Sequence, residues 1–335
     1  MTQHGKSALD VIALSPHDLV HCRRLIADYP HKPFYYYPLF SNAALTDYML
    51  DELTDVVQKN SSWCYGVKVD DHVQGLVVCG KRAWETSVLG MEAGFIGPLI
   101  VDERNAHSNQ LRHALLAQAL ACLAHAEIVQ VTARLDVNDI ALLHLLEAMG
   151  FITLDGILHF SLDLRHGTGF RVEGDQQGVI YCRLHRETDI PVLCNIAARA
   201  YSHDRFHSDP VIDPAVADRA YACWIENACH GLDDAVMVAI HEDEPVGFMT
   251  LKISPRTKKY LGATVGKIWL VAVAEHMRSQ RVGQQLMHHS LQWFSQHGVD
   301  IVEVGTQLRN APGLRFYSRV GFVPINPVFA LRKVV

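Results

Sequence analysis

Two short segments near the carboxyl end of the chain carry residue types that can bind an anion and move a proton. The first, residues 275–286, places Arg278, Arg281 and Gly283 between a run of apolar β-formers and a helical pattern. A helix N-terminus offers unpaired N–H donors and a partial positive charge, and Gly283 has no Cβ to obstruct a close approach. The sequence therefore predicts a phosphate site at this turn.

The second segment, residues 310–322, combines an amide and a phenol. Asn310 ends a predicted strand, and Tyr317 follows seven residues later, two helical turns on, so both lie on one helix face. A phenol with a pKa of about 10 can give a proton to a leaving group of comparable basicity. An aromatic side chain at this spacing is also typical of a helix core, and asparagine is a favoured N-cap. Both alternatives stay open for these two residues.

The elements that must position these segments follow from the periodicity of the second half. Strands alternate with helices in a mixed order, with a meander of strands before a β-α-β-α-β tail, which is typical of an α/β fold with one central sheet. We expect strands at 179–184, 235–240, 245–254, 267–274 and 299–306, and helices at 191–201, 214–229, 282–297 and before Gly321.

The first half repeats this order in weaker form. The pairs Gly150-Phe151 and Gly321-Phe322 lie at an interval of 171 residues, and Val101 and Val273, which end two apolar strands, lie at an interval of 172. This agreement predicts a duplication, with a first domain at 1–164, a glycine-rich linker at 165–178 and a second domain at 179–335. The first copy lacks the loop glycine and has a leucine where the second has Tyr317, so we expect one cofactor site, in the second domain.

Composition limits the remaining function classes. The chain has 335 residues and a formal net charge of −6, so no global basic field favours nucleic acid or an anionic membrane. The eight scattered cysteines form no C-x-x-C pair and indicate reduced thiols in a cytoplasmic protein. We expect neither a signal peptide nor a membrane span, and the 20 histidines lack H-E-x-x-H, so no metal is expected.

The two segments together resemble the GNAT superfamily of acyl-CoA-dependent N-acyltransferases. A loop of the form [RQ]-x-x-G-x-[GA] maps onto residues 278–283, with Arg281 in place of the first glycine, and an N-x-x-A-x-x-x-Y pattern maps onto Asn310, Gly313 and Tyr317. The resemblance implies an α/β fold of two GNAT-like domains, each a mixed central sheet flanked by helices, of which the first lacks the cofactor loop. At Arg281 we expect an added phosphate contact.

The resemblance also implies acetyl-CoA as cofactor and direct attack of an amine on its thioester. Tyr317 is then the general acid, and backbone N–H groups on the strand stabilise the oxyanion. The predicted cofactor-binding residues are Leu270, Val271, Ala272, Val273, Arg278, Ser279, Gln280, Arg281, Val282, Gly283, Gln284 and Asn310.

A narrower resemblance, in residues 187–210 and 221–231, is to the dTDP-fucosamine acetyltransferases, which carry a W-[DE]-[ST] element seen here as Trp84-Glu85-Thr86. It implies an amine acceptor such as a nucleotide-linked amino sugar, and makes a homodimer plausible. A peptide, polyamine or drug amine is the alternative acceptor, and a non-catalytic acyl-CoA sensor is the alternative function. The predicted acceptor-side residues are His203, Arg205, Phe206, His207 and Glu303, with core packing as the alternative for Phe206 and a paired or exposed carboxylate as the alternative for Glu303.

Overall fold

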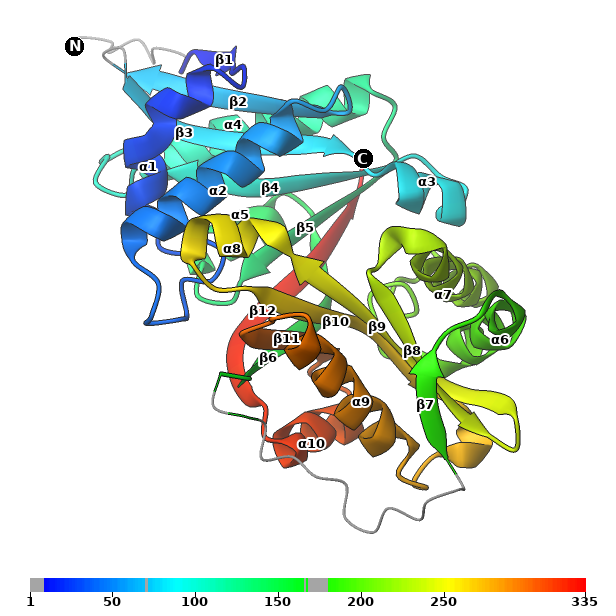
Figure 1. Cartoon of the computed structure of the whole chain (residues 1–335). Coiled ribbons are helices and arrows are strands. Elements are labelled where there is room, and N and C mark those ends of the chain that lie inside the picture. The colour runs from blue at the N-terminus through cyan, green and yellow to red at the C-terminus, as the bar shows by residue number, and fades with distance from the viewer. Residues whose placement is uncertain (1–8, 70–71, 166, 168–179) are drawn as a thin grey trace, which may run out of the picture. The chain divides into compact units, whose positions relative to one another are not determined.

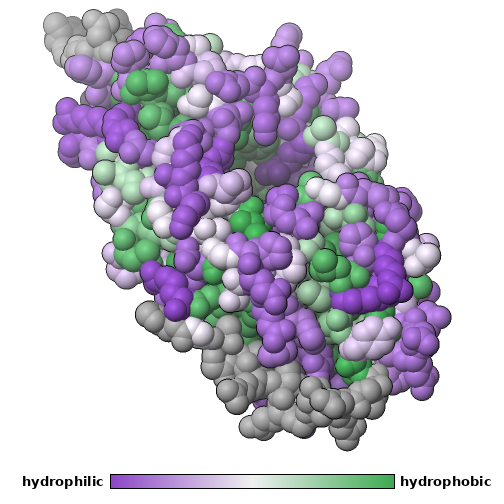
Figure 2. All heavy atoms as spheres, viewed as in Figure 1, coloured by the Kyte–Doolittle hydropathy of each residue, from purple (hydrophilic) through white to green (hydrophobic). Residues whose placement is uncertain are grey.

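The computed structural model describes residues 9–69, 72–165, 167 and 180–335, and the chain divides into two compact units. Unit 1 comprises the residues up to Thr153 together with Val328–Val335, and unit 2 comprises Leu154–Pro327. Each unit is a mixed α/β layer structure in which helices flank a central sheet (Figure 1). The visible face mixes hydrophilic side chains with smaller apolar areas (Figure 2).

The sheet of unit 1 has the strand order β1-β2-β3-β4-β5-β12. Helices α1 and α2 cover one apolar layer and helices α4 and α5 cover the other. The strands are β1 Val11–Ala13, β2 Ser62–Val69, β3 His72–Lys81, β4 Ala93–Val101, β5 Gln130–Asp136 and β12 Val323–Val334, and the helices are α1 Arg23–Asp28, α2 Asn42–Val57, α3 Ala83–Leu89, α4 Ser108–His125 and α5 Ile140–Ala148.

The sheet of unit 2 has the order β6-β11-β10-β9-β8-β7. Its largest core cluster packs α9 and α10 onto one face through residues such as Leu286, Phe294 and Tyr317. The strands are β6 Ile152–Asp163, β7 Tyr181–Leu184, β8 Ala235–His241, β9 Glu244–Ser254, β10 Val265–Val273 and β11 Ile301–Gln307, and the helices are α6 Ile190–Ala200, α7 Pro214–Asn227, α8 Pro255–Leu261, α9 Val282–Gln296 and α10 Ala311–Val320.

The boundary between the units differs from the one expected at residue 164. The last strand of the first half, β6, pairs with β11 in unit 2, while residues 328–334 of β12 pair with β5 in unit 1. Each half of the sequence therefore gives its final strand to the other unit. Local hydrophobic pattern identifies a strand but not its pairing partner, which is why the expected domain ends were misplaced. The predicted linker lies almost wholly outside the described residues, which include only Arg165 and Gly167 of it.

The two units share one unusual strand arrangement at the interval that the sequence predicts. In unit 1, β4 and β5 pair in parallel from Ala93 with Gln130 over four residues. In unit 2, β10 and β11 pair in parallel from Val265 with Ile301, again over four residues. The corresponding residues lie 172 and 171 positions apart, so the intervals read from the sequence recur in the strand register.

Candidate functional site

Strands β10 and β11 separate in the middle of the sheet. Their parallel pairing ends at Ile268 with Val304, although β10 continues to Val273 and β11 to Gln307. The register of β10 with β9 also shifts between Ile268 and Val271. A bulge increases local twist and redirects a strand, which accounts for the divergence. Backbone groups on the two facing strand edges are thereby released from sheet pairing.

The released edge of β10 is defined by its remaining hydrogen bonds. The Leu270 N–H donates to Thr250 Oγ1 at 3.1 Å, and the Ala274 N–H donates to the Val246 carbonyl at 2.9 Å. Because successive residues of an antiparallel strand direct their backbone groups to opposite sides, Val271 and Val273 direct theirs towards the gap. Of the four backbone donors predicted here, that of Leu270 is therefore already engaged by Thr250.

The turn after β10 adopts a backbone shape that glycine would favour. Both Ser279 and Arg281 have positive φ angles, of 64° and 63°, and Arg281 is the N-cap of α9 without a side-chain cap hydrogen bond. A left-handed non-glycine residue costs about 1 kcal/mol, so the turn is held in this shape by its surroundings. Met277 anchors it in the core, whereas Arg278, Ser279 and Gln280 are exposed. The corner is thus open and cationic.

The first turn of α9 combines a buried anchor with an accessible backbone. The Val282 side chain is 1% exposed, while Gly283 and Gln284 are half-buried. A Cβ built on Gly283 would meet only Phe316, at 3.6 Å, which is an ordinary contact. Neither a positive φ nor crowding within the protein requires this glycine. Its presence is consistent with a ligand that approaches the backbone closely.

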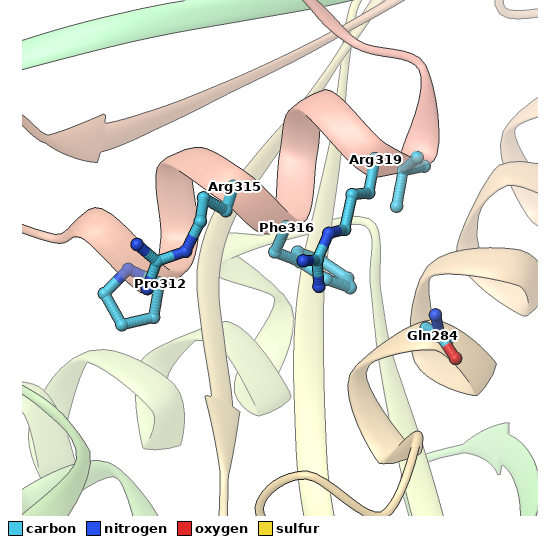
Figure 3. Close-up of a pocket in the computed structure, with 6 residues that line it drawn as sticks. Gln284, Pro312, Arg315, Phe316 and Arg319 are labelled. Atoms are coloured by element: carbon cyan, nitrogen blue, oxygen red, sulfur yellow. The ribbon is translucent and has the colours of Figure 1, made fainter.

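A cavity of about 230 Å³ lies beside this turn. Figure 3 shows Arg315 and Arg319 on the same side of α10 as Phe316, with Gln284 across from them on α9. Two guanidinium groups spaced four residues apart on one helix can hold a phosphate through several charge-assisted hydrogen bonds. The sequence reasoning missed these two arginines, although their spacing was visible beside Tyr317.

The corresponding corner of unit 1 is built differently. Its arginines are held in ion pairs, because Arg104 contacts Asp102 at 2.9 Å and Asp28 at 2.6 Å, and Arg112 pairs with Glu103. The described residues between β4 and α4 show no positive φ angle. The position that corresponds to Tyr317 is Leu146, which is 1% exposed in the core. The two corners therefore differ in the backbone shape of the turn and in the residue that corresponds to Tyr317.

Tyr317 lies on the inner face of α10, against the apolar layer under α9. Its side chain is 6% exposed, and its ring packs near Phe160, Phe316 and Phe322 at centroid distances of 5.8, 5.4 and 6.0 Å. Burial raises the pKa of the phenol, so it stays protonated at neutral pH. The core alternative is thus correct for the ring, and a ring held in the core is compatible with a hydroxyl that donates a proton.

A second phenol, which was not predicted, marks the open edge of β10. The Tyr201 hydroxyl donates to the Val271 carbonyl at 3.1 Å, and its ring stacks on Tyr221 at 4.0 Å. Burial, with the neighbouring Tyr317, raises the pKa of Tyr201. Tyr201 is the first residue of the segment that was predicted to contact the acceptor. Its place in that segment is the sequence feature that could have identified it.

Asn310 has the capping geometry that the sequence left open. Its Oδ1 accepts from the Gly313 N–H at 3.1 Å, and its Nδ2 donates to Thr306 Oγ1 at 2.9 Å. A Cβ at Gly313 would lie 2.6 Å from Asn310 Nδ2, so this cap leaves no room for an alanine at 313 without movement of the amide. Asn310 thus fixes the start of α10 relative to β11, and its contact with a cofactor stays a prediction.

The segment 201–209 is tied down at several points. Asp204 accepts from the Phe206 N–H at 2.8 Å and contacts His207 Nδ1 at 2.6 Å, while His207 Nε2 contacts Asp218 at 3.1 Å. Hydrogen bonds to both carboxylates raise the pKa of His207 against the opposing effect of burial. These contacts give His207 a structural role, so substrate contact by this ring stays a prediction.

The remaining acceptor-side residues of this segment differ in exposure. Phe206 is 2% exposed, which matches its core alternative, and the Arg205 guanidinium lies over its ring at 4.1 Å. His203 is exposed, and its carbonyl accepts from Arg309 Nη2 at 3.3 Å. The same Arg309 nitrogen donates to the Leu154 carbonyl at 3.2 Å and to Ser208 Oγ. Arg309, missed from sequence, therefore holds the segment beside the end of β11.

Two titratable residues near β11 have different environments. Glu303 is 5% exposed and contacts Lys267 Nζ at 3.7 Å in the part of the sheet where β10 and β11 still pair. It has the paired geometry that was the alternative to an acceptor contact. His159 lies opposite Gly305, beyond the point of separation, and its Nδ1 is 3.1 Å from the Asn326 carbonyl. Donation from Nδ1 places the lone pair on Nε2.

His159 occupies space that a glycine provides. A Cβ on Gly305 would lie 3.0 Å from His159 Cδ2 and 3.2 Å from Nε2, so the imidazole packs directly over the backbone of β11. No local sequence pattern predicts this contact, because the two residues are far apart in the chain. A neutral imidazole beside the separated strands can accept a proton from an amine.

Within the described residues, no group of three or more His, Cys, Asp or Glu side chains is placed to hold a metal ion. In the same part of the chain, every helix is too short or too polar to cross a membrane.

Comparison with known proteins agrees with this geometry. Residues 193–322 match the model of the acetyltransferase (GNAT) family. These residues form a GNAT acetyltransferase domain. The matched range contains β10, the turn, α9, β11 and α10, so it includes the candidate site except for His159 on β6, and the chain is an acyltransferase.

Relatives extend the likeness beyond the matched domain. The chain is 27% identical over 194 residues to the dTDP-fucosamine acetyltransferase of Escherichia coli O6:H1, which covers 57% of this chain and 76% of that protein. A GCN5-related N-acetyltransferase from Sphaerobacter thermophilus aligns with a TM-score of 0.66 and 15% identity over 97% of this chain and 95% of that one. A tandem GNAT protein from the clavulanic acid biosynthesis pathway aligns with a TM-score of 0.61 and 13% identity over 98% of both chains. Both alignments extend over nearly the whole chain, and the second is with a tandem GNAT structure, so the likeness in fold includes both units.

Proposed function

We propose that this GNAT protein transfers an acetyl group from acetyl-CoA to the amine of a nucleotide-linked amino sugar. The observation that carries the proposal is the separation of β10 from β11 beside the open turn of α9. An extended acyl thioester can lie along the released edge of β10 while its diphosphate meets the helix N-terminus. The nucleotide sugar follows from the likeness to a dTDP-fucosamine acetyltransferase.

The turn supplies the groups that a CoA diphosphate requires. Arg278 and Arg281 provide charge, and the backbone of Val282, Gly283 and Gln284 provides N–H donors. Ser279 and Gln280 complete the exposed rim of the turn. We assign the adjoining cavity, with Arg315 and Arg319, to the phosphorylated adenosine end of the cofactor. The dianionic phosphate of that end would satisfy both guanidinium groups.

Transfer then proceeds without an acyl-enzyme. The amine nitrogen attacks the thioester carbonyl, the new C–N bond forms and the C–S bond breaks. The backbone N–H groups of Val271 and Val273 are directed towards the developing oxyanion. Tyr317 gives its proton to the departing thiolate, and His159 Nε2 accepts the proton that the amine loses. Positioning of the two reactants supplies much of the rate.

An activity assay tests the reaction class and the acceptor together. The protein is incubated with acetyl-CoA and with dTDP-linked amino sugars, a polyamine, an aminoglycoside and an amine-terminated peptide in separate reactions. The release of the CoA thiol is followed over time, and the masses of the products are determined by mass spectrometry. We expect an added acetyl group on the nucleotide sugar. If only another amine is acetylated, the proposed acceptor is wrong and that amine takes its place. Binding of acetyl-CoA without transfer to any amine would favour the non-catalytic sensor.

Two further predictions stay untested. A cytoplasmic location and a homodimer follow from the sequence argument and the resemblance, and no contact described above depends on either.

A further inference from the structure

A second cavity, in unit 1, has the chemistry of a nucleotide site. It measures about 320 Å³ and is lined by Lys81, Arg82, Ala83, Trp84, Glu85 and Phe95. These residues include two cations, one carboxylate, an indole and a phenyl ring. The Trp84-Glu85-Thr86 element singled out in the sequence forms part of its wall, and no step of the proposed reaction uses it.

The backbone around this cavity is fixed by short hydrogen bonds. Lys81 ends β3 and its N–H donates to the Ser61 carbonyl at 2.7 Å, while the Arg82 N–H donates to the Ala93 carbonyl at 2.8 Å. The Thr86 hydroxyl accepts from the Ala93 N–H at 3.0 Å, which ties α3 to β4. The cavity is therefore preformed, as small-molecule sites usually are.

The charged groups of the cavity leave a net positive charge. Glu85, whose side chain is 5% exposed, contacts Arg82 Nη1 at 3.5 Å, and the Arg82 guanidinium also lies 5.1 Å from the centre of the Phe95 ring. A Cβ on Gly80 would lie 2.7 Å from Phe95 Cε1, so close packing holds the ring. Arg82 is thus oriented from two sides, and the exposed Lys81 adds a second cation that Glu85 does not balance.

We propose that this cavity of unit 1 binds a nucleoside diphosphate. Its diphosphate lies against Lys81 and Arg82, and its base packs on the Trp84 indole. Cations orient phosphate oxygens through charge-assisted hydrogen bonds, and an aromatic face accepts a base by stacking. The inference rests on the proposed function for the identity of the nucleotide, and it gives unit 1 a ligand site of its own.

The test is calorimetric titration of the full chain with dTDP, with thymidine and inorganic pyrophosphate as separate arms. Lys81→Gln should weaken dTDP and pyrophosphate binding about tenfold, because one charge-assisted hydrogen bond is lost. Trp84→Leu should weaken dTDP and thymidine binding about fivefold or more through lost stacking. Lys59→Gln, at another exposed lysine of unit 1, should change none of these affinities.

Acetyl-CoA binding, measured on the same samples, separates the two proposals and reports folding. Retained acetyl-CoA affinity with weakened dTDP binding in Lys81→Gln supports the inference. Acetyl-CoA binding without dTDP binding, or dTDP binding that neither substitution changes, overturns the inference and leaves the cofactor site in place. A wild-type chain that binds dTDP but not acetyl-CoA would instead refute the proposed function.

Discussion

The hydroxyl of Tyr201 and the carbonyl of Val271 are joined by a hydrogen bond of 3.1 Å on the edge of β10 that β11 has left. This bond connects the end of α6 to the released strand edge. Burial, with a smaller contribution from Tyr317, raises the pKa of Tyr201. The contact places the start of the acceptor-side segment on the open edge of β10.

Tyr317→Phe should lower kcat about 100-fold or more, because the thiolate would leave without its proton donor. The affinity for acetyl-CoA should stay within about twofold of the parent value, since the ring keeps its core packing. Steady-state kinetics and calorimetry measure the two quantities. Unchanged turnover in a folded variant would remove Tyr317 from the chemistry.

His159→Gln should lower kcat about 100-fold with little change in the KM for acetyl-CoA, because the amine loses its proton acceptor. The exposed His230, which lies after α7, provides a matched control, and His230→Gln should leave turnover unchanged. Equal effects of the two substitutions would assign deprotonation to water or another group. The initial rate with saturating acceptor is the relevant measurement.

Arg315→Gln with Arg319→Gln should weaken acetyl-CoA binding about tenfold, because two guanidinium contacts to a phosphate are lost. The same pair of substitutions should have little effect on acetyl-dephospho-CoA, which lacks the phosphate on the adenosine ribose. Calorimetry with both ligands measures the difference. Equal weakening for both ligands would show that the cavity lined by Arg315 and Arg319 does not hold the phosphate on the adenosine ribose.

The contribution of His207 to stability should depend on pH. Its pKa in the folded protein is raised above the ordinary value of 6.5, with Asp218 and Asp204 as the favourable partners and Arg205 and Tyr221 nearby. The stabilisation is therefore fully present below about pH 6.5 and is lost as pH rises through the raised pKa.

His207→Gln should accordingly reduce the free energy of unfolding more at about pH 6 than at about pH 8.5. Urea unfolding of both proteins at each pH measures this difference. The substitution Arg219→Ala, at an exposed residue of α7, should show no comparable dependence. A larger loss at the higher pH would mean that the neutral imidazole is the favoured form in the folded protein.

The sequence predicted the parts of the site that depend on local pattern. The start of α9 at Val282, the placement of Tyr317 on the inner face of α10 and the internal repeat all follow from periodicity and spacing. The duplication was visible because both copies keep the same strand-helix-strand order, and the interval recurs in the paired strands.

Contacts between distant segments could not be predicted in this way. His159 over Gly305, Arg309 with the 203–208 segment and the exchange of β6 and β12 each depend on tertiary pairing. The short helices α3 and α8 were missed because seven residues are too few to establish a helical period. The cap at Asn310 was foreseen as an alternative, since asparagine serves that role often.

Capture of the acetyl-CoA diphosphate at the turn before α9 is the central requirement of the proposed function, and calorimetry of a variant of this turn tests it most directly. Arg278→Ala combined with Gly283→Glu removes a cation and places a carboxylate where the backbone must be approached, while Arg219→Ala controls for loss of an exposed arginine. We expect binding by the parent and the control, and a loss of affinity of about 100-fold or more in the double variant. Unchanged binding in a folded double variant would contradict the placement of the cofactor.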